Sequence, residues 1–271
     1  MKSHFAGVEI HPSSIVSDNA KIGKGTKIGP FCLIGPNVEI GESNTFKSHA
    51  VVEGHTKIGN GNTFHQFCSI GDTPQDTTYK GEPTRVEIGD NNIFREYNSV
   101  HRATMKEVQL TKIGSNNLFM SYVHLAHDVV IGNKVTFANS VNLAGHVHIG
   151  DRVIIGGATN IGQFISLGRG AYIGGASAID KDIPPFCTAY GNRIRLKGIN
   201  IIGMKRQGYS KQEISDVVDF FRMMEASALS SRSFVEHEEF IKDYNGNKVI
   251  EEIREFVRKS ETGIAPFMFN G

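Results

Sequence analysis

Aliphatic residues or phenylalanine recur at every sixth position over most of this chain, with polar residues and glycines between them. One unbroken series comprises Ile113, Phe119, Leu125, Ile131, Phe137, Leu143, Ile149, Ile155, Ile161, Leu167, Ile173 and Ile179. An earlier series comprises Ile10, Val16, Ile22, Ile28, Ile34, Ile40, Phe46, Val52, Ile58, Phe64 and Ile70. A period of six differs from the 3.6 of an α-helix and from the alternation of strands in a two-sheet sandwich. It indicates the hexapeptide repeats of a parallel β-helix.

Each repeat predicts one short strand and one corner, and three successive repeats predict one triangular turn. The repeated apolar side chain points inward, and successive turns stack at roughly 4.8 Å. Glycine often follows the apolar residue, as at Gly23, Gly41 and Gly59. We expect these glycines to let the backbone bend where a Cβ would collide.

The repeat is interrupted twice, which predicts two loops projecting from the coil, at 72–85 and 101–112. After the first, Ile88 resumes the original register; after the second, the register is shifted by one residue and Ile113 begins the longer series. Loops on a rigid repeat scaffold are common places for function.

The coil is expected to end near Asp182, because Pro184 and Pro185 cannot extend a ladder of backbone hydrogen bonds. We therefore predict a β-helix over residues 1–190 and a helical domain over residues 191–271.

Helical patterns follow in the second part. Ser210 and Glu213 form a capping box before an apolar stripe, and Ser233 and Glu236 repeat the same spacing. A further stripe with helical spacing consists of Val249, Ile250, Ile253, Phe256 and Val257. These helices are expected to cover the open end of the coil.

Composition narrows the choice of partners and compartment. A formal net charge of +1 gives no support to a nucleic-acid partner. The N-terminus has no apolar stretch of signal-peptide length, and no run of apolar residues is long enough for an integral membrane segment. We expect a cytoplasmic protein.

The 3 cysteines include no CxxC pair. Cys32 and Cys68 lie two turns apart, about 9 to 10 Å at strand spacing, which is too far for a disulfide. Both are expected to be free thiols in the core.

The sequence His124-Leu-Ala-His127-Asp128 is the principal candidate site. Residues separated by three repeats should stack one above the other, so His127, Gly145 and Gln163 fall in one column. Asp128, His146 and Phe164 fall in the next column. These polar residues therefore come together within about 10 Å along the coil axis.

A neutral imidazole is suited to accept a hydroxyl proton near pH 7. Asp128 is expected to fix the tautomer of His127, and the backbone N–H of Gly145 to stabilise an oxyanion. The competing interpretation is a solvated polar ladder. A zinc site formed by His124, His127 and His146 is a third, although the columns do not place these histidines in one ring.

For three other sets of residues, the sequence is compatible with more than one role. Gln75 and Asp76, in the first loop, suit hydrogen bonds to a sugar or simple solvation. Gly157 and Gly175, one turn apart, suit a shallow trough. A basic run beyond the coil suits a diphosphate, an acidic partner or a solvated linker, and consists of Arg193, Arg195, Lys197, Lys205 and Arg206.

Several motifs together resemble one family. They are IGPFCLIGPNVEIG, GHTKIG at 54–59, PQD at 74–76, GEPTRVEIGD, HLAHD, LAGHV at 143–147, DIPPF and RKSETGI. In these motifs the chain resembles the UDP-N-acetylglucosamine O-acyltransferases, which catalyse the first step of lipid A synthesis in Gram-negative bacteria. The resemblance runs nearly end to end. It implies a homotrimer of left-handed parallel β-helices of hexapeptide repeats, each with a C-terminal α-helical domain, and active sites between subunits.

The resemblance also implies the chemistry. A 3-hydroxyacyl group passes from acyl carrier protein to the 3-hydroxyl of UDP-N-acetylglucosamine, with no further cofactor and no metal. His127 would be the general base, supported by Asp128, and Gly145 the oxyanion donor. The substrate-binding positions implied are Gln75, Asp76, His124, His146, Gln163, Gly175, Asn200 and Arg206. Of these, Asn200 and Arg206 match positions near the uridine and phosphates, and Gly175 matches the position that limits acyl-chain length.

The chain departs from the family pattern in four places. Gly162 replaces a common histidine, Thr78 a lysine, Ile202 an acidic residue and Gln207 an arginine. These departures are compatible with an alternative interpretation, in which the protein is a paralogue that acylates another nucleotide sugar, such as a 3-amino analogue, or that uses acyl-CoA. A zinc hydratase and a non-catalytic scaffold on the same coil are the remaining alternatives.

Overall fold

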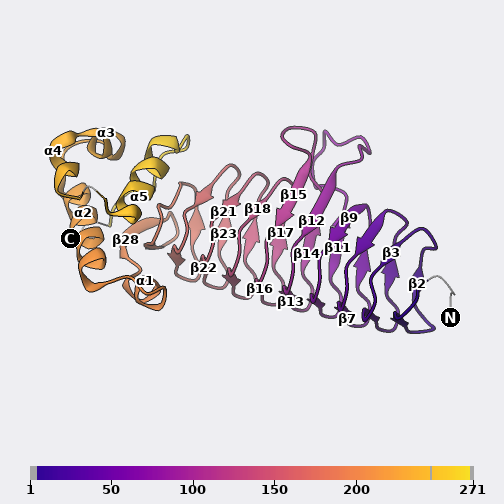
Figure 1. Cartoon of the computed structure of the whole chain (residues 1–271). Helices are drawn as coiled ribbons and strands as arrows, with labels where there is room; N and C mark the ends of the chain where they lie inside the picture. Colours follow the sequence, from indigo (N-terminus) through magenta and orange to yellow (C-terminus); the bar gives the residue numbers. More distant parts are fainter. Residues whose placement is uncertain (1–4, 245, 269–271) are drawn as a thin grey trace.

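The computed structural model describes residues 5–244 and 246–268. Figure 1 shows a long three-sided coil with the N-terminus at one end and a group of helices at the other. Two loops project together from one side of the coil, near β12 and β15.

Three sheets run along the coil, one on each side. The first contains β1 (Glu9–Ile10), β4 (Lys27–Ile28), β7 (Thr45–Phe46), β10 (Thr63–Phe64), β13 (Ile93–Phe94), β16 (Leu118–Phe119), β19 (Thr136–Phe137), β22 (Ile154–Ile155), β25 (Tyr172–Ile173), β27 (Cys187–Tyr190) and β28 (Arg195–Ile199). The second contains β2 (Ile15–Val16), β5 (Leu33–Ile34), β8 (Val51–Val52), β11 (Ser69–Asp72), β14 (Ser99–His101), β17 (His124–Leu125), β20 (Asn142–Leu143), β23 (Asn160–Ile161) and β26 (Ala178–Ile179). The third contains β3 (Lys21–Ile22), β6 (Val38–Ile40), β9 (His55–Ile58), β12 (Arg85–Ile88), β15 (Leu110–Ile113), β18 (Val130–Ile131), β21 (His148–Ile149) and β24 (Ser166–Leu167).

Parallel pairing confirms that three repeats make one turn. Leu125 pairs with Leu143, and Leu143 pairs with Ile161. Every residue of the series from Ile113 to Ile179 is buried in one continuous core. Ile10 and Ile22, near the N-terminal end, are only partly buried. The predicted fold class, a left-handed parallel β-helix with a C-terminal helical part, is confirmed.

The expected role of the glycines is only partly right. A Cβ on Gly23, Gly41 or Gly59 would lie within 2.8 Å of a backbone atom of the next turn, so these positions require glycine for close approach. The bend itself occurs two residues later, at corner residues such as Phe31 and Asp128, whose φ values are 58° and 60°. Many corners therefore place ordinary side chains in the left-handed region, where the stacked turns hold them, whereas Gly25 and Gly61 occupy the same position at others.

A buried ladder of asparagines supports one corner of the coil. The side-chain oxygen of Asn44 accepts the N–H of Asn62, at 2.8 Å, and the same contact links Asn62 to Asn92 and Asn92 to Asn117. Each side chain thus satisfies backbone groups that would otherwise be buried without partners. The hydrophobic pattern did not indicate this ladder.

Both interruptions of the repeat are loops, but strands extend into the predicted ranges. The residues between strands are 73–84 after β11 and 102–109 after β14. They are shorter than 72–85 and 101–112 at their starts because β11 and β14 extend to Asp72 and His101, which pair with each other. They are shorter at their ends because β12 and β15 are four residues long and pair along their whole length.

The coil continues beyond its predicted end near Asp182. β27 follows the two prolines and pairs in parallel with β25, and β28 then pairs with β27 in the antiparallel direction. The prolines are tolerated because they precede β27, whose ladder begins at Cys187.

The helices are α1 (Ile201–Arg206), α2 (Lys211–Ala226), α3 (Ser231–Glu236), α4 (Glu238–Ile241), the 3₁₀ turn η1 (Lys242–Tyr244) and α5 (Lys248–Lys259). The capping box of Ser210 and Glu213 is confirmed. The second predicted box is wrong, because α3 is capped by Ser230, whose side chain accepts the N–H of Ser233. None of the helices among the described residues is long and apolar enough to cross a membrane.

The helices cover the C-terminal end of the coil, as expected. Phe221 of α2 belongs to the core of the coil, and Phe186 belongs to the core formed by the helices. Arg169 of the coil also donates to Glu252 of α5, with Nε 3.1 Å from Oε1. Cys32, Cys68 and Cys187 are buried and free, as predicted for the first two.

Candidate active site

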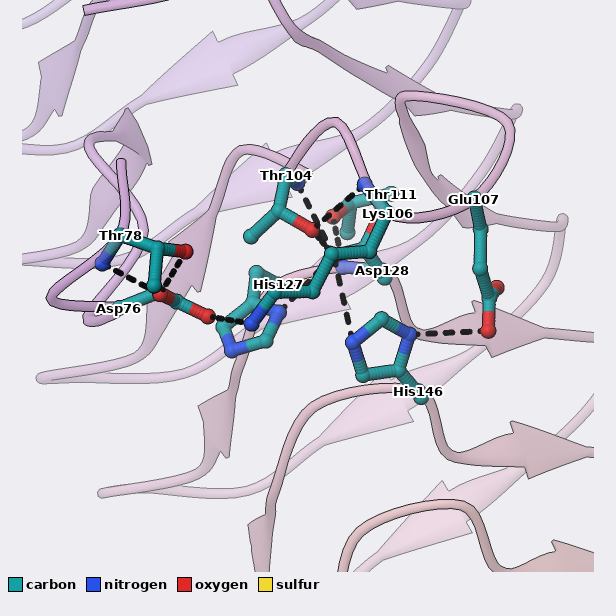
Figure 2. A network of polar contacts seen from close by, with 9 residues as sticks. All are labelled: Asp76, Thr78, Thr104, Lys106, Glu107, Thr111, His127, Asp128 and His146. Atoms are coloured by element: carbon teal, nitrogen blue, oxygen red, sulfur yellow. Dashed lines mark hydrogen bonds and ion pairs between the residues drawn. The ribbon is translucent and has the colours of Figure 1, made fainter. Parts of the chain in front are cut away.

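His127 and Asp128 form the corner between β17 and β18. A strand would direct consecutive side chains to opposite faces, but the positive φ of Asp128, 60°, turns the backbone. His127 Nδ1 consequently lies 2.9 Å from Asp128 Oδ2, as Figure 2 shows. Both side chains are almost fully buried, with 5% and 1% exposed.

The second loop holds the carboxylate of Asp128. Thr104 donates to Oδ2 from its backbone N–H, at 2.9 Å, and from its hydroxyl, at 2.7 Å. Thr111 Oγ1 accepts the backbone N–H of Asp128. Burial raises the pKa of Asp128, but the hydrogen bonds from His127 and Thr104 outweigh it and leave the pKa below the usual value. Asp128 is therefore ionised at neutral pH and accepts Nδ1–H, which leaves Nε2 of His127 as the basic nitrogen.

Gly145 lies directly against the imidazole of His127. A Cβ at this position would be 2.3 Å from His127 Cε1 and 2.8 Å from both ring nitrogens. Among the described residues, none accepts a hydrogen bond from the Gly145 N–H. The predicted column of His127, Gly145 and Gln163 is confirmed, since all three line one open groove of about 370 Å³.

Gln75 and His124 line the same groove. His124 Nδ1 lies 2.8 Å from the hydroxyl oxygen of Ser99. Burial, followed by the nearby His101 and His127, lowers the pKa of His124 to about 4. His124 is consequently neutral at physiological pH and offers the groove an uncharged hydrogen-bonding ring.

The second predicted column, of Asp128, His146 and Phe164, is also confirmed, but it faces away from this groove. The rings of His146 and Phe164 stack at 4.5 Å, and His146 Nε2 lies 3.8 Å from Asp128 Oδ2. His146 Nδ1 lies 2.9 Å from Glu107 Oε1. His146 and Phe164 line a different groove, of about 350 Å³, next to α5. His146 thus supports the corner from behind.

The three histidines weighed as zinc ligands do not form one cluster. Within the described part of the chain, the group with metal-ligand spacing is His127, Asp128 and His146. The shared carboxylate oxygen already accepts hydrogen bonds from His127 Nδ1 and twice from Thr104. The other oxygen, Oδ1, is buried without a hydrogen-bond partner among the described residues. This group differs from the predicted set because Asp128 takes the place of His124.

Asp76 lies beside the groove and is held by two segments. Thr78 donates to Oδ1 from its N–H, at 2.8 Å, and from its hydroxyl, at 2.6 Å. Lys106 of the second loop lies 2.6 Å from Oδ2. The hydrogen bonds from Lys106 and Thr78 hold the pKa of Asp76 below its usual range.

Three predicted site residues do not line the groove that contains His127. Gly175 is at a corner after β25, between the first and second sheets, whereas His127 is between the second and third. Asn200 caps α1 by accepting the N–H of Gly203 and also donates to the carbonyl of Gly170. Arg206 is exposed at the end of α1.

Sequence reasoning missed Thr104, Lys106, Glu107 and Thr111. They lie in or next to the second loop, outside the register that placed the columns. Their only signal was the interruption of the repeat itself.

The repeat and the helical part each match a family model. One described as bacterial transferase hexapeptide (six repeats) matches residues 19–54 and 110–145. Another, described as UDP-N-acetylglucosamine O-acyltransferase, domain 2, matches residues 182–265. Together with the His–Asp corner over a groove, these matches define a hexapeptide-repeat transferase.

Relatives narrow the class further. The acyl-(acyl-carrier-protein)–UDP-N-acetylglucosamine O-acyltransferase of Sulfurihydrogenibium sp. is 54% identical over 96% of this chain and 95% of its own. LpxA from Acinetobacter baumannii superposes with a TM-score of 0.91 at 42% identity, covering 94% of this chain and 99% of its own. The UDP-N-acetylglucosamine acyltransferase of Francisella novicida gives 0.90 at 38%, over 96% and 95% of the two chains. The chain belongs to the UDP-N-acetylglucosamine O-acyltransferase family.

Proposed function

We propose that this protein transfers a 3-hydroxyacyl group from acyl carrier protein to the glucosamine 3-hydroxyl of UDP-N-acetylglucosamine, the first step of lipid A synthesis. The observation that carries the proposal is the buried His127–Asp128 pair opening onto a groove beside Gly145. Family membership supplies the substrates, since the relative that is 54% identical carries both in its name. For that reason, the 3-amino analogue and acyl-CoA are not favoured as alternatives.

The proposed reaction uses the two ring nitrogens of His127 differently. Asp128 holds Nδ1–H at 2.9 Å, so Nε2 accepts the proton of the sugar 3-hydroxyl as its oxygen attacks the thioester carbonyl. A new C–O bond forms, and the carbonyl oxygen becomes an oxyanion that the N–H of Gly145 stabilises. The C–S bond then breaks, and the departing thiolate takes the proton from His127.

The groove provides the recognition groups for the acceptor. Gln75, His124 and Gln163 line it together with His127, so amide and neutral imidazole groups face a sugar rich in hydroxyls. Asp76 lies beside the groove, and His146 lies behind the His127–Asp128 corner. We assign nucleotide and phosphate contacts to Asn200 and Arg206, and the limit on acyl length to Gly175, because these match family positions.

A homotrimer with sites between subunits accounts for the residues that one chain keeps apart. Gly175 lies on a different corner from His127, so a neighbouring copy has to supply it. Its own corner also carries an exposed aromatic ladder, with successive rings 4.9 to 5.1 Å apart: Phe31, His49, Phe67, Tyr97 and Tyr122. Packing of copies would remove this apolar surface from water.

The reaction needs no further cofactor, because the thioester is already an activated acyl donor. The proposed substrates, a thioester on acyl carrier protein and a nucleotide sugar, are both water-soluble. We therefore place the protein in the cytoplasm.

The test is acyl transfer by the purified chain, with 3-hydroxyacyl-acyl carrier protein and UDP-N-acetylglucosamine as substrates. His127→Ala should lower kcat by about 10²- to 10⁴-fold, the usual contribution of a general base. His55→Ala, at an exposed histidine of β9, is the matched control and should keep full activity. Calorimetric titration with the nucleotide sugar should show that His127→Ala still binds. An active His127→Ala variant would refute the mechanism, and an inactive wild type that binds no nucleotide sugar would refute the function.

A further inference from the structure

The second loop, residues 102–109, carries two neighbouring residues of opposite charge that reach in different directions. Lys106 Nζ lies 2.6 Å from Oδ2 of Asp76, in the first loop. Glu107 Oε1 lies 2.9 Å from Nδ1 of His146, on the coil. Figure 2 shows both contacts on either side of the His127–Asp128 corner. We call Lys106 and Glu107 the clasp.

The partners of the clasp are better buried than the clasp itself. The side chains of Asp76 and His146 are 10% and 2% exposed, whereas those of Lys106 and Glu107 are 49% and 37% exposed. Ion pairs between fully exposed side chains contribute little, but a partner shielded from water strengthens the interaction. The Lys106–Asp76 pair therefore restrains the first loop more than an ordinary surface pair would, and Glu107 is joined to the buried His146 by a hydrogen bond.

Lys106 and Thr78 together hold both oxygens of the Asp76 carboxylate. Thr78 occupies Oδ1 with two hydrogen bonds, and Lys106 occupies Oδ2. Gln75, the next residue, lines the groove with His127. Because a peptide bond joins Gln75 to Asp76, a restraint on Asp76 also limits where the backbone of Gln75 can lie.

Further contacts make the second loop the common anchor of the site. Arg102 donates to the carbonyl of Gly71, in β11 just before the first loop, and to the hydroxyl of Tyr79, within the loop. Thr104 holds Asp128. One short segment thus touches the first loop, the His127–Asp128 corner and His146.

We propose that the clasp fixes the acceptor groove: Lys106 holds Gln75 opposite His127 through Asp76, and Glu107 holds His146 behind Asp128. Lys106 and Glu107 are positioning residues, since each acts through another side chain. The proposal rests on the proposed function, because its consequence is stronger binding of the nucleotide sugar.

Lys106→Met, which keeps the length of the side chain and removes its charge, tests the clasp. We expect the KM for UDP-N-acetylglucosamine to rise roughly tenfold while kcat stays within about twofold, the signature of lost uniform binding. Lys106→Arg should return KM to within about threefold of wild type, because it restores the charged contact. Lys27→Ala is the matched control: it removes an exposed pair with Glu9, at 3.0 Å, far from the groove, and should change neither constant.

Hydrogen–deuterium exchange provides a readout that does not depend on activity. In Lys106→Met the amides of residues 73–84 should exchange several-fold faster, while β17 and β20 keep wild-type rates. Unchanged KM and exchange, or a Lys106→Arg variant as impaired as Lys106→Met, would overturn the clasp. If the wild type proves inactive, the exchange rates alone still decide whether Lys106 fixes the first loop, so the two failures are distinguishable.

Discussion

Gly145→Ala is the most direct perturbation of the proposed base. The added methyl group would stand 2.3 Å from His127 Cε1, where a separation of at least about 3.4 Å is needed for ordinary contact. The backbone of the coil is fixed by the turns on either side, so the imidazole has to yield. The N–H of Gly145 is retained, so the substitution leaves the oxyanion donor in place.

The required displacement sets the expected loss. The imidazole has to retreat by about 1 Å, which is enough to break its 2.9 Å hydrogen bond to Asp128. A displacement of this size at a reacting group costs about 10²-fold in rate. The free energy of unfolding should fall by about 1 to 3 kcal/mol from overpacking.

Steady-state acyl transfer and urea unfolding measure the two effects. Gly198→Ala is the control, because no atom lies within 4 Å of its added Cβ. The double variant with His127→Ala isolates the contact: with the ring removed, the methyl group has space, and Gly145→Ala should no longer destabilise the fold. A Gly145→Ala variant with wild-type kcat, or the same destabilisation in both backgrounds, would refute this reasoning.

Two further predictions concern the same corner. Asp128→Asn should lower kcat about 10²-fold or more while calorimetry still detects nucleotide-sugar binding, because a neutral amide no longer stabilises the imidazolium that forms when His127 takes the proton; a wild-type kcat would contradict this. Folding lowers the pKa of His124 from 6.5 to about 4, so the unfolded chain takes up a proton that the folded chain does not. The free energy of unfolding should therefore fall as the pH drops from about 6.5 to about 4. Urea unfolding across this range should show a smaller fall for His124→Gln, and an equal fall would count against the assigned cause.

The repeat made much of the site predictable without a structure. Once three repeats make one turn, sequence arithmetic places Gly145 on His127 and His146 on Asp128, because parallel strands in register keep side chains in columns. The structure bears out both contacts. The same register predicted which residues fill the core.

Other features had no periodic signal. Glycine makes the left-handed bend at some corners, such as Gly25 and Gly61, but ordinary side chains such as Phe31 and Asp128 make it at others. The two prolines were expected to end the coil, yet β27 continues it, because proline prevents a hydrogen bond only at its own nitrogen. The cap of α3 lies at Ser230, one of several serines with similar local spacing.

The sequence alone determined the β-helix, the inward residues and the columns that join His127 to Gly145 and Asp128 to His146, because each depends only on a constant number of repeats per turn. The tertiary structure decided what surrounds that corner. Thr104, Lys106 and Glu107 come from a loop outside the register, and loop conformation depends on long-range contacts with groups such as Asp76 and Asp128. The orientation of His146 away from the groove likewise follows from the corner geometry in three dimensions, which the spacing does not contain.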